Sequence, residues 1–151
     1  MGVGPSRARI ASFVGAVVGF LALGACQSTK SVETLISERP ALVGHSAQVP
    51  PEALSLLSLA GEESVGKVEY VDQAARRVVF SQIHPYMGFR MAMIVTTAEP
   101  NERGSTISIW TDGLKPARGT WPQRLWEAYS KRLDAMGAWH DQAAPPGDGD
   151  K

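Results

Sequence analysis

Cys26 is the residue with the clearest chemical potential in this chain, because it is the only cysteine among 151 residues. A single thiol forms no disulfide within the chain, so this one needs another role. It follows an apolar and small-residue run from Ile10 to Ala25, which begins just after Arg7 and Arg9. Basic residues, an apolar run and small residues in this order predict a secretion signal that is removed from the mature protein. The alternative is an uncleaved membrane anchor, but the apolar run is shorter than the ~20 residues that a spanning helix needs.

The four residues Leu23-Gly24-Ala25-Cys26 resemble the lipobox of bacterial lipoproteins. The resemblance implies that residues 1–25 are a signal peptide, that a peptidase cuts before Cys26, and that the thiol carries a diacylglyceryl group. The freed amine is often acylated too, and two or three acyl chains hold a protein on a membrane durably. Gln27 stands where an aspartate would imply retention at the inner membrane. The resemblance therefore implies the periplasmic leaflet of an outer membrane.

The charge balance gives no reason to expect a nucleic-acid partner. Residues 1–25 contain two of the 15 basic residues and none of the 15 acidic ones, so the mature chain is slightly acidic. Without a basic surface there is no electrostatic steering toward phosphate. The partners that the sequence predicts are the membrane, through the acyl chains on Cys26, and an envelope protein.

Titratable side chains outside the lipobox do not form a recognisable catalytic or metal-binding pattern. The candidates are His45, His84, His140, Glu99, Glu102 and Asp112. The histidines lack the i,i+4 spacing of a helical metal site, and His84 is expected in a solvent-facing loop. The three carboxylates could converge only through the fold. We therefore assign no catalytic, cofactor-binding or metal-binding residue and expect no cofactor.

The chain divides into four predicted parts. These are a signal peptide (1–25), a lipidated cysteine with a flexible tether (26–51), a globular domain (52–140) and a disordered tail (141–151). The tether is predicted because prolines and Gly44 interrupt it and no hydrophobic period is sustained. Pro145 and Pro146, with alternating glycine and aspartate, indicate the tail.

The predicted fold is a small α+β domain with a four-stranded antiparallel sheet and two helices on one face. A short N-terminal helix begins near Glu52 and is expected to stop at Gly61. Alternating or β-branched runs predict four strands joined as hairpins, at residues 65–71, 77–83, 89–97 and 105–111. Phe89, Met91, Met93 and Val95 are expected on one face of the third strand, and Arg90, Ala92, Ile94 and Thr96 on the other.

The C-terminal helix has the strongest pattern. Thr120 and Gln123 form a predicted capping box, and Gly137 marks the end. One face of the helix is apolar and is expected to lie on the sheet; its residues are Leu125, Trp126, Tyr129, Leu133 and Met136.

Exposed contact residues are predicted in the loop between the second and third strands. Tyr86, Met87 and Arg90 combine aromatic, thioether and guanidinium groups, a composition typical of protein-binding patches. The alternative is that they close the end of the sheet. The four tryptophans all lie in the last third of the chain and are expected in the core rather than on a ligand platform.

These observations favour a non-enzymatic, membrane-anchored lipoprotein that serves as an accessory or assembly component of an envelope complex. The alternative is a periplasmic module that binds a small molecule or lipid, with Met87, Met91 and Met93 lining an adaptable cavity. A cell-wall hydrolase has only the predicted compartment in its favour.

Overall fold

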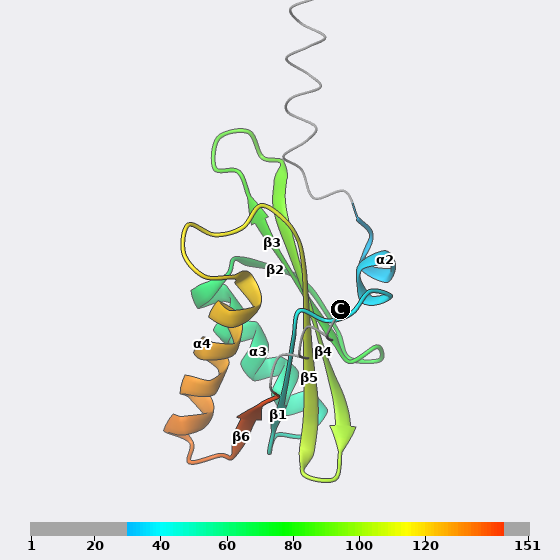
Figure 1. Ribbon diagram of the computed structural model, residues 1–151, viewed down its shortest axis with the longest axis vertical. Coiled ribbons are helices and arrows are strands. Elements are labelled where there is room, and N and C mark those ends of the chain that lie inside the picture. The colour runs from blue at the N-terminus through cyan, green and yellow to red at the C-terminus, as the bar shows by residue number, and fades with distance from the viewer. Residues whose placement is uncertain (1–29, 144–151) are drawn as a thin grey trace, which may run out of the picture.

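The fold is an open antiparallel sheet with helices on both faces (Figure 1). The computed structural model describes residues 30–143, so the predicted signal peptide, Cys26 and residues 144–151 lie outside the described part. In chain order the elements are α2 (Val32–Ile36), β1 (Leu42–Ser46), α3 (Pro50–Ser64), β2 (Lys67–Asp72), β3 (Arg77–Ile83), β4 (Arg90–Asn101), β5 (Gly104–Gly113), α4 (Trp121–Ala135) and β6 (His140–Gln142). The strand order is β2-β3-β4-β5-β1-β6. The prediction of a small α+β domain built on an antiparallel sheet is confirmed.

The predicted number of strands is wrong, because the sheet has six and not four. β1 comes from the segment expected as a flexible tether, and β6 includes the first residues of the expected tail. β1 pairs with β5 along its whole length, with Leu42 opposite Ile109. Its inward side chains are Leu42, Gly44 and Ser46, of which only the first is apolar. Without three apolar residues in alternation, this strand has no visible period in the sequence.

Large aromatic side chains of α4 explain why β1 carries small residues. A Cβ atom on Gly44 would collide with the Trp126 ring, so any larger residue here would force the ring to move. Two residues later, the Ser46 hydroxyl lies 2.8 Å from the Tyr129 hydroxyl, and both residues are fully buried. The strand and the helix are therefore fitted to one another, small against large.

The helix α4 follows the predicted pattern closely. The Thr120 hydroxyl accepts a hydrogen bond from the Gln123 backbone N–H at 3.3 Å, which confirms the Thr120 half of the capping box. The Gln123 side chain instead donates to Glu127 and accepts from Gln142. Leu125, Trp126 and Leu133 are buried against the sheet and α3. The last residue of the predicted apolar face is an exception, because Met136 is 57 % exposed.

The helix α3 runs past its predicted end. Gly61 was expected to stop it, but the helix continues to Ser64 and Gly61 is buried inside it. The reason is contact: the Phe80 ring of β3 occupies the space where a Cβ atom on Gly61 would lie. The glycine therefore allows close approach of helix and sheet.

The second face of the sheet is also covered, by the short helix α2 (Figure 1). Leu35 packs on Val79, Met93, Val95 and Trp110, which form a small buried cluster. The predicted alternation of β4 is found, since Ala92 and Ile94 belong to the larger cluster beneath α3 and α4. Both faces of this strand are buried.

Candidate functional site

The chain is fixed to the sheet only four residues after Cys26. The Lys30 backbone N–H donates to Asp112 Oδ2 at 3.5 Å, and its Nζ donates to Glu38 Oε1 at 2.6 Å. The hydrogen bond with Glu38 raises the pKa of Lys30. Because a residue spans at most ~3.5 Å, the Cα atoms of Cys26 and Lys30 lie within about 14 Å. The segment expected as a flexible tether (26–51) therefore belongs to the described fold from Lys30 onward and leaves only a short link to Cys26. We call the end of the sheet around Asp112 the anchored end. Within residues 30–143, no helix is long and apolar enough to cross a membrane.

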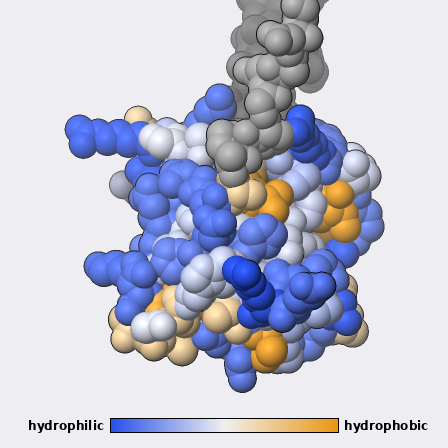
Figure 2. Space-filling model, turned by 60° about the horizontal axis from the view of Figure 1, so that its bottom comes forward, coloured by the Kyte–Doolittle hydropathy of each residue, from blue (hydrophilic) through white to orange (hydrophobic). Residues whose placement is uncertain are grey.

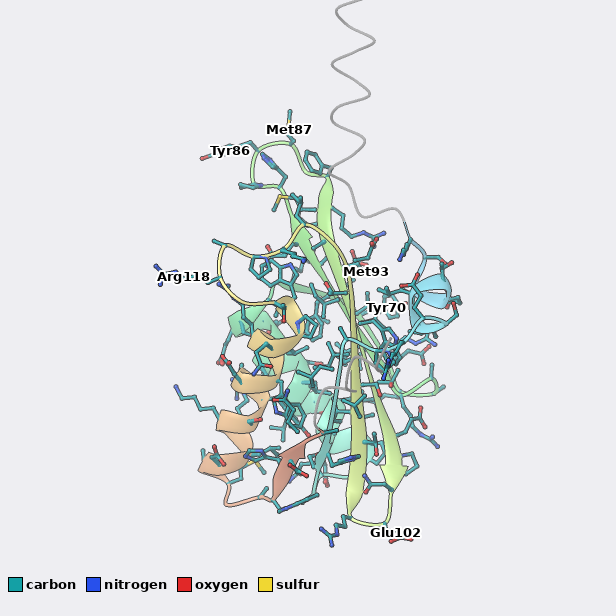
Figure 3. The ribbon with its side chains drawn as sticks, in the orientation of Figure 1. Tyr70, Tyr86, Met87, Met93, Glu102 and Arg118 are labelled. Carbon is teal, nitrogen blue, oxygen red and sulfur yellow. The ribbon has the colours of Figure 1, made fainter. Side chains whose placement is uncertain are left out.

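The hairpin tip, residues 84–89 between β3 and β4, projects from the anchored end (Figure 3). His84 organises it: Nδ1 accepts hydrogen bonds from the backbone N–H groups of Tyr86 (3.3 Å) and Met87 (3.1 Å). The His84 ring also stacks on Phe89 with centroids 5.0 Å apart. This internal bonding turns the remaining side chains outward, and Tyr86 is 93 % and Met87 60 % exposed.

Arg90 does not join the other two predicted contact residues at the tip. It is the first residue of β4, is half-buried, and lies 3.5 Å from a Glu69 carboxylate oxygen on β2. A partly solvated ion pair of this kind contributes little to stability, but it holds the Arg90 guanidinium against β2 at the base of the hairpin. The structure thus brings Tyr86 and Met87 together and leaves Arg90 beside the sheet edge.

A second exposed surface lies at the opposite end of the sheet. We call it the distal surface and define it by Val49, Leu56, Arg103, Met136 and Trp139. The Arg103 guanidinium lies 5.2 Å from the centre of the Trp139 ring, a cation–π arrangement, and the ring is 42 % exposed. Figure 2 brings this end forward and shows apolar patches among hydrophilic side chains.

Two shallow hollows shape the distal surface. One has a volume of about 420 Å³ and lies between His45, Arg103 and Trp139. The other, of about 550 Å³, lies between Pro51, Leu56 and Met136. The sequence contains no signal for this surface, because its residues come from three separate segments. Trp139, expected in the core, is exposed.

The histidines and carboxylates are not gathered into a reactive cluster in the described part of the chain. His45 Nδ1 lies 3.2 Å from the Thr106 hydroxyl, and His140 Nε2 lies 2.8 Å from Asp134 Oδ1. Among the carboxylates considered, Glu102 is at the distal turn and Asp112 at the other end of β5. Within residues 30–143, no three His, Cys, Asp or Glu side chains are close enough to hold a metal ion.

Comparison with protein-family models, with curated proteins and with solved structures finds no match to this chain in any of the three.

Proposed function

We propose that this protein is a bacterial lipoprotein held by acyl chains on Cys26 at the periplasmic leaflet of the outer membrane. There it serves, without catalysis, as an accessory or assembly component that binds another envelope protein. The lipobox and Gln27 support the attachment and the location. The hydrogen bond from Lys30 to Asp112 supports a position of the folded domain close to the proposed lipidation point.

The observation that carries the protein-binding proposal is the exposure of Trp139 beneath Arg103 at the distal surface. Tryptophan, arginine and methionine are the residues enriched where proteins bind one another, and Met136 adds an exposed thioether nearby. β5 has ten residues between this surface and the anchored end. At about 3.3 Å per residue, the surface lies ~30 Å from the link, where an envelope protein can reach it.

The ligand-binding alternative lacks a supporting observation at the place where it was expected. Met93 is fully buried in the cluster beneath α2, together with Leu35 and Trp110. It is therefore packed among core side chains and does not line a cavity. The prediction that Tyr86, Met87 and Arg90 contact the protein partner stays a prediction, and the experiment below tests it beside the distal surface.

The attachment is tested by Cys26→Ser in the full chain, followed by mass spectrometry and metabolic lipid labelling. We expect an uncleaved precursor without lipid, and loss of durable membrane retention. Processing before residue 26 together with retained lipid label would show that the lipobox interpretation is wrong.

Partner binding is tested with two matched double variants, each removing one exposed aromatic and one exposed methionine. Trp139→Ala with Met136→Ala changes the distal surface, and Tyr86→Ala with Met87→Ala changes the hairpin tip. In cross-linking and pull-down from solubilised membranes, the distal variant should lose a co-purifying protein while its melting temperature shows a folded domain. Loss with the tip variant alone would move the partner site to the hairpin tip. If both variants recover as much co-purifying protein as the parent chain does, a partner site on either surface is refuted.

A further inference from the structure

Two loops meet at the anchored end of the domain. One is the hairpin tip, and the other is the β5–α4 loop, residues 114–120. They start side by side, because the Leu114 backbone N–H donates to the Met91 carbonyl oxygen at 2.9 Å. In Figure 3, Tyr86 and Met87 point away from the body of the domain, and Arg118 projects from the neighbouring loop.

The side chains of these loops combine exposed apolar groups with positive charge. Besides Tyr86 and Met87, Leu114 is 44 % exposed. Lys115 and Arg118 are exposed on the β5–α4 loop. Residues 83–91 and 113–126 contain no aspartate or glutamate. At the base of the loops, Glu69 contacts Arg90 and Asp112 contacts Lys30. Tyrosine, apolar side chains and basic groups on the projecting loops are the composition that favours the interface of an anionic lipid bilayer.

The length of the link places this end near the membrane. Asp112, which holds Lys30, pairs with Met93 of β4, and Arg90 at the base of the hairpin tip is three residues further. That is ~10 Å along the strand, with the tip beyond it. A link of at most about 14 Å cannot hold the lipid plane far from the tip.

The face covered by α2 also lies close to the link, but its charged side chains are paired with one another. Glu38 lies 2.6 Å from Lys30 and Glu33 lies 3.1 Å from Arg77. Toward the distal end of β4, Glu99 lies 2.8 Å from Arg76. Basic groups already paired with carboxylates attract anionic headgroups less than Lys115 and Arg118 do, so the two loops are favoured as the resting surface.

We propose that the hairpin tip and the β5–α4 loop rest on the lipid surface, with Tyr86, Met87 and Leu114 in the headgroup region and Lys115 and Arg118 on anionic headgroups. The proposal rests on the proposed attachment through Cys26. It makes these loops a second, weak membrane contact that sets the orientation of the domain and turns the distal surface away from the membrane.

The test imposes the attachment, so that it does not depend on natural acylation. A chain of residues 27–151, which keeps every described element of the fold, carries six histidines in place of Cys26 and is tethered to vesicles through nickel-chelating lipid. The vesicles contain phosphatidylethanolamine, phosphatidylglycerol and a spin-labelled lipid quencher. Because no other cysteine remains, Met87→Cys and Glu102→Cys each give one fluorophore site, at the tip and at the distal turn.

We expect strong quenching by the spin-labelled lipid at position 87 and little at position 102. Equal quenching at both sites, or stronger quenching at position 102, would overturn the proposed orientation. If a protein that co-purifies with the chain shields the fluorophore at position 87 from water, and the spin-labelled lipid does not quench it, the tip contacts a protein partner instead. Absence of natural acylation, read from the mass of the membrane-purified protein, would refute only the proposed attachment.

Charge reversal tests the basic loop separately. Lys115→Glu with Arg118→Glu should lower the affinity of the untagged chain for phosphatidylglycerol vesicles on the order of tenfold or more, because each basic group near the surface contributes about 1 kcal/mol. Lys131→Glu with Arg103→Glu, on the far face of α4 and at the distal turn, changes the net charge by the same amount and is the matched control, so it should lower the affinity much less. Equal losses would show that net charge alone governs vesicle binding, and would overturn the assigned contact.

Discussion

Replacing Gly61 with alanine should have two opposing effects on the free energy of unfolding. The tertiary structure decides which of the two is larger. In an isolated helix the change is favourable, because alanine is about 0.8–1.0 kcal/mol better than glycine in a helix interior. In this protein Gly61 lies in the fourth and last full turn of α3, packed against β3. An added Cβ atom would lie closer than 3.0 Å to three carbon atoms of the Phe80 ring.

The packing cost should exceed the gain in helix propensity. Phe80 is fully buried within the main core cluster, so its ring moves only by displacing other core side chains. Overpacking of this kind typically costs about 1–3 kcal/mol. We take the upper half of that range, because neither the helix backbone nor the ring is free to withdraw. Gly61→Ala should then lower the free energy of unfolding by about 1–2 kcal/mol.

Urea denaturation of residues 27–151, followed by circular dichroism, measures this difference. Glu62→Ala, at the exposed neighbouring position, is the control and should stay within about 0.5 kcal/mol of the parent. The sharper test uses Phe80→Leu, which shortens the opposing side chain: in that background Gly61→Ala should become neutral or stabilising. Stabilisation by Gly61→Ala alone would mean that α3 does not approach β3 as closely as described, and would refute the reasoning.

Three further outcomes test the core and the cap. Leu133→Ala, at a fully buried position, should cost about 2–5 kcal/mol in urea melts, whereas exposed Lys131→Ala should cost less than about 0.5; equal costs would contradict packing of α4 on the sheet. Thr120→Ala removes the acceptor for the Gln123 backbone N–H and should lower the free energy of unfolding by ~1 kcal/mol in the same melts. An unchanged free energy of unfolding would show that the cap is dispensable. Burial raises the pKa of Tyr129 to about 12 from 10.0, so the folded state keeps a proton that the unfolded state releases. Stability should therefore be unaffected by this group below about pH 10 and fall by up to ~1.4 kcal/mol per unit between about pH 10 and 12, and Tyr129→Phe should remove that component of the slope.

Much of the fold was predictable where local patterns are strong. The cap at Thr120 and the buried face of α4 follow from helical periodicity, which depends on residues three and four apart. The hairpin β2–β3 follows from alternation around a polar turn, and β3 begins and ends at the predicted residues. Exposure of Tyr86 and Met87 was decided by the structure, because a loop that leads into a strand can equally pack on its own sheet.

Other features could not be predicted because their causes lie elsewhere in the chain. β1 is hidden by Gly44, which is small only because Trp126 packs over it. Gly61 resembles a helix stop until Phe80 is placed beside it. The distal surface unites Arg103 with Trp139, which no local pattern connects.

The sequence by itself predicts the resemblance to a lipobox, and it determines the two main helices and four of the strands, because each depends on neighbours along the chain. Only the tertiary structure decides that the predicted tether is largely folded, that α2 covers the second face, and that Lys30 binds Asp112. These three features depend on contacts between residues up to 82 positions apart. Such residues are brought together only when the sheet is assembled. The physical reason is that a helix or hairpin forms from local periodicity, whereas the complementarity of small and large side chains is settled where distant segments meet.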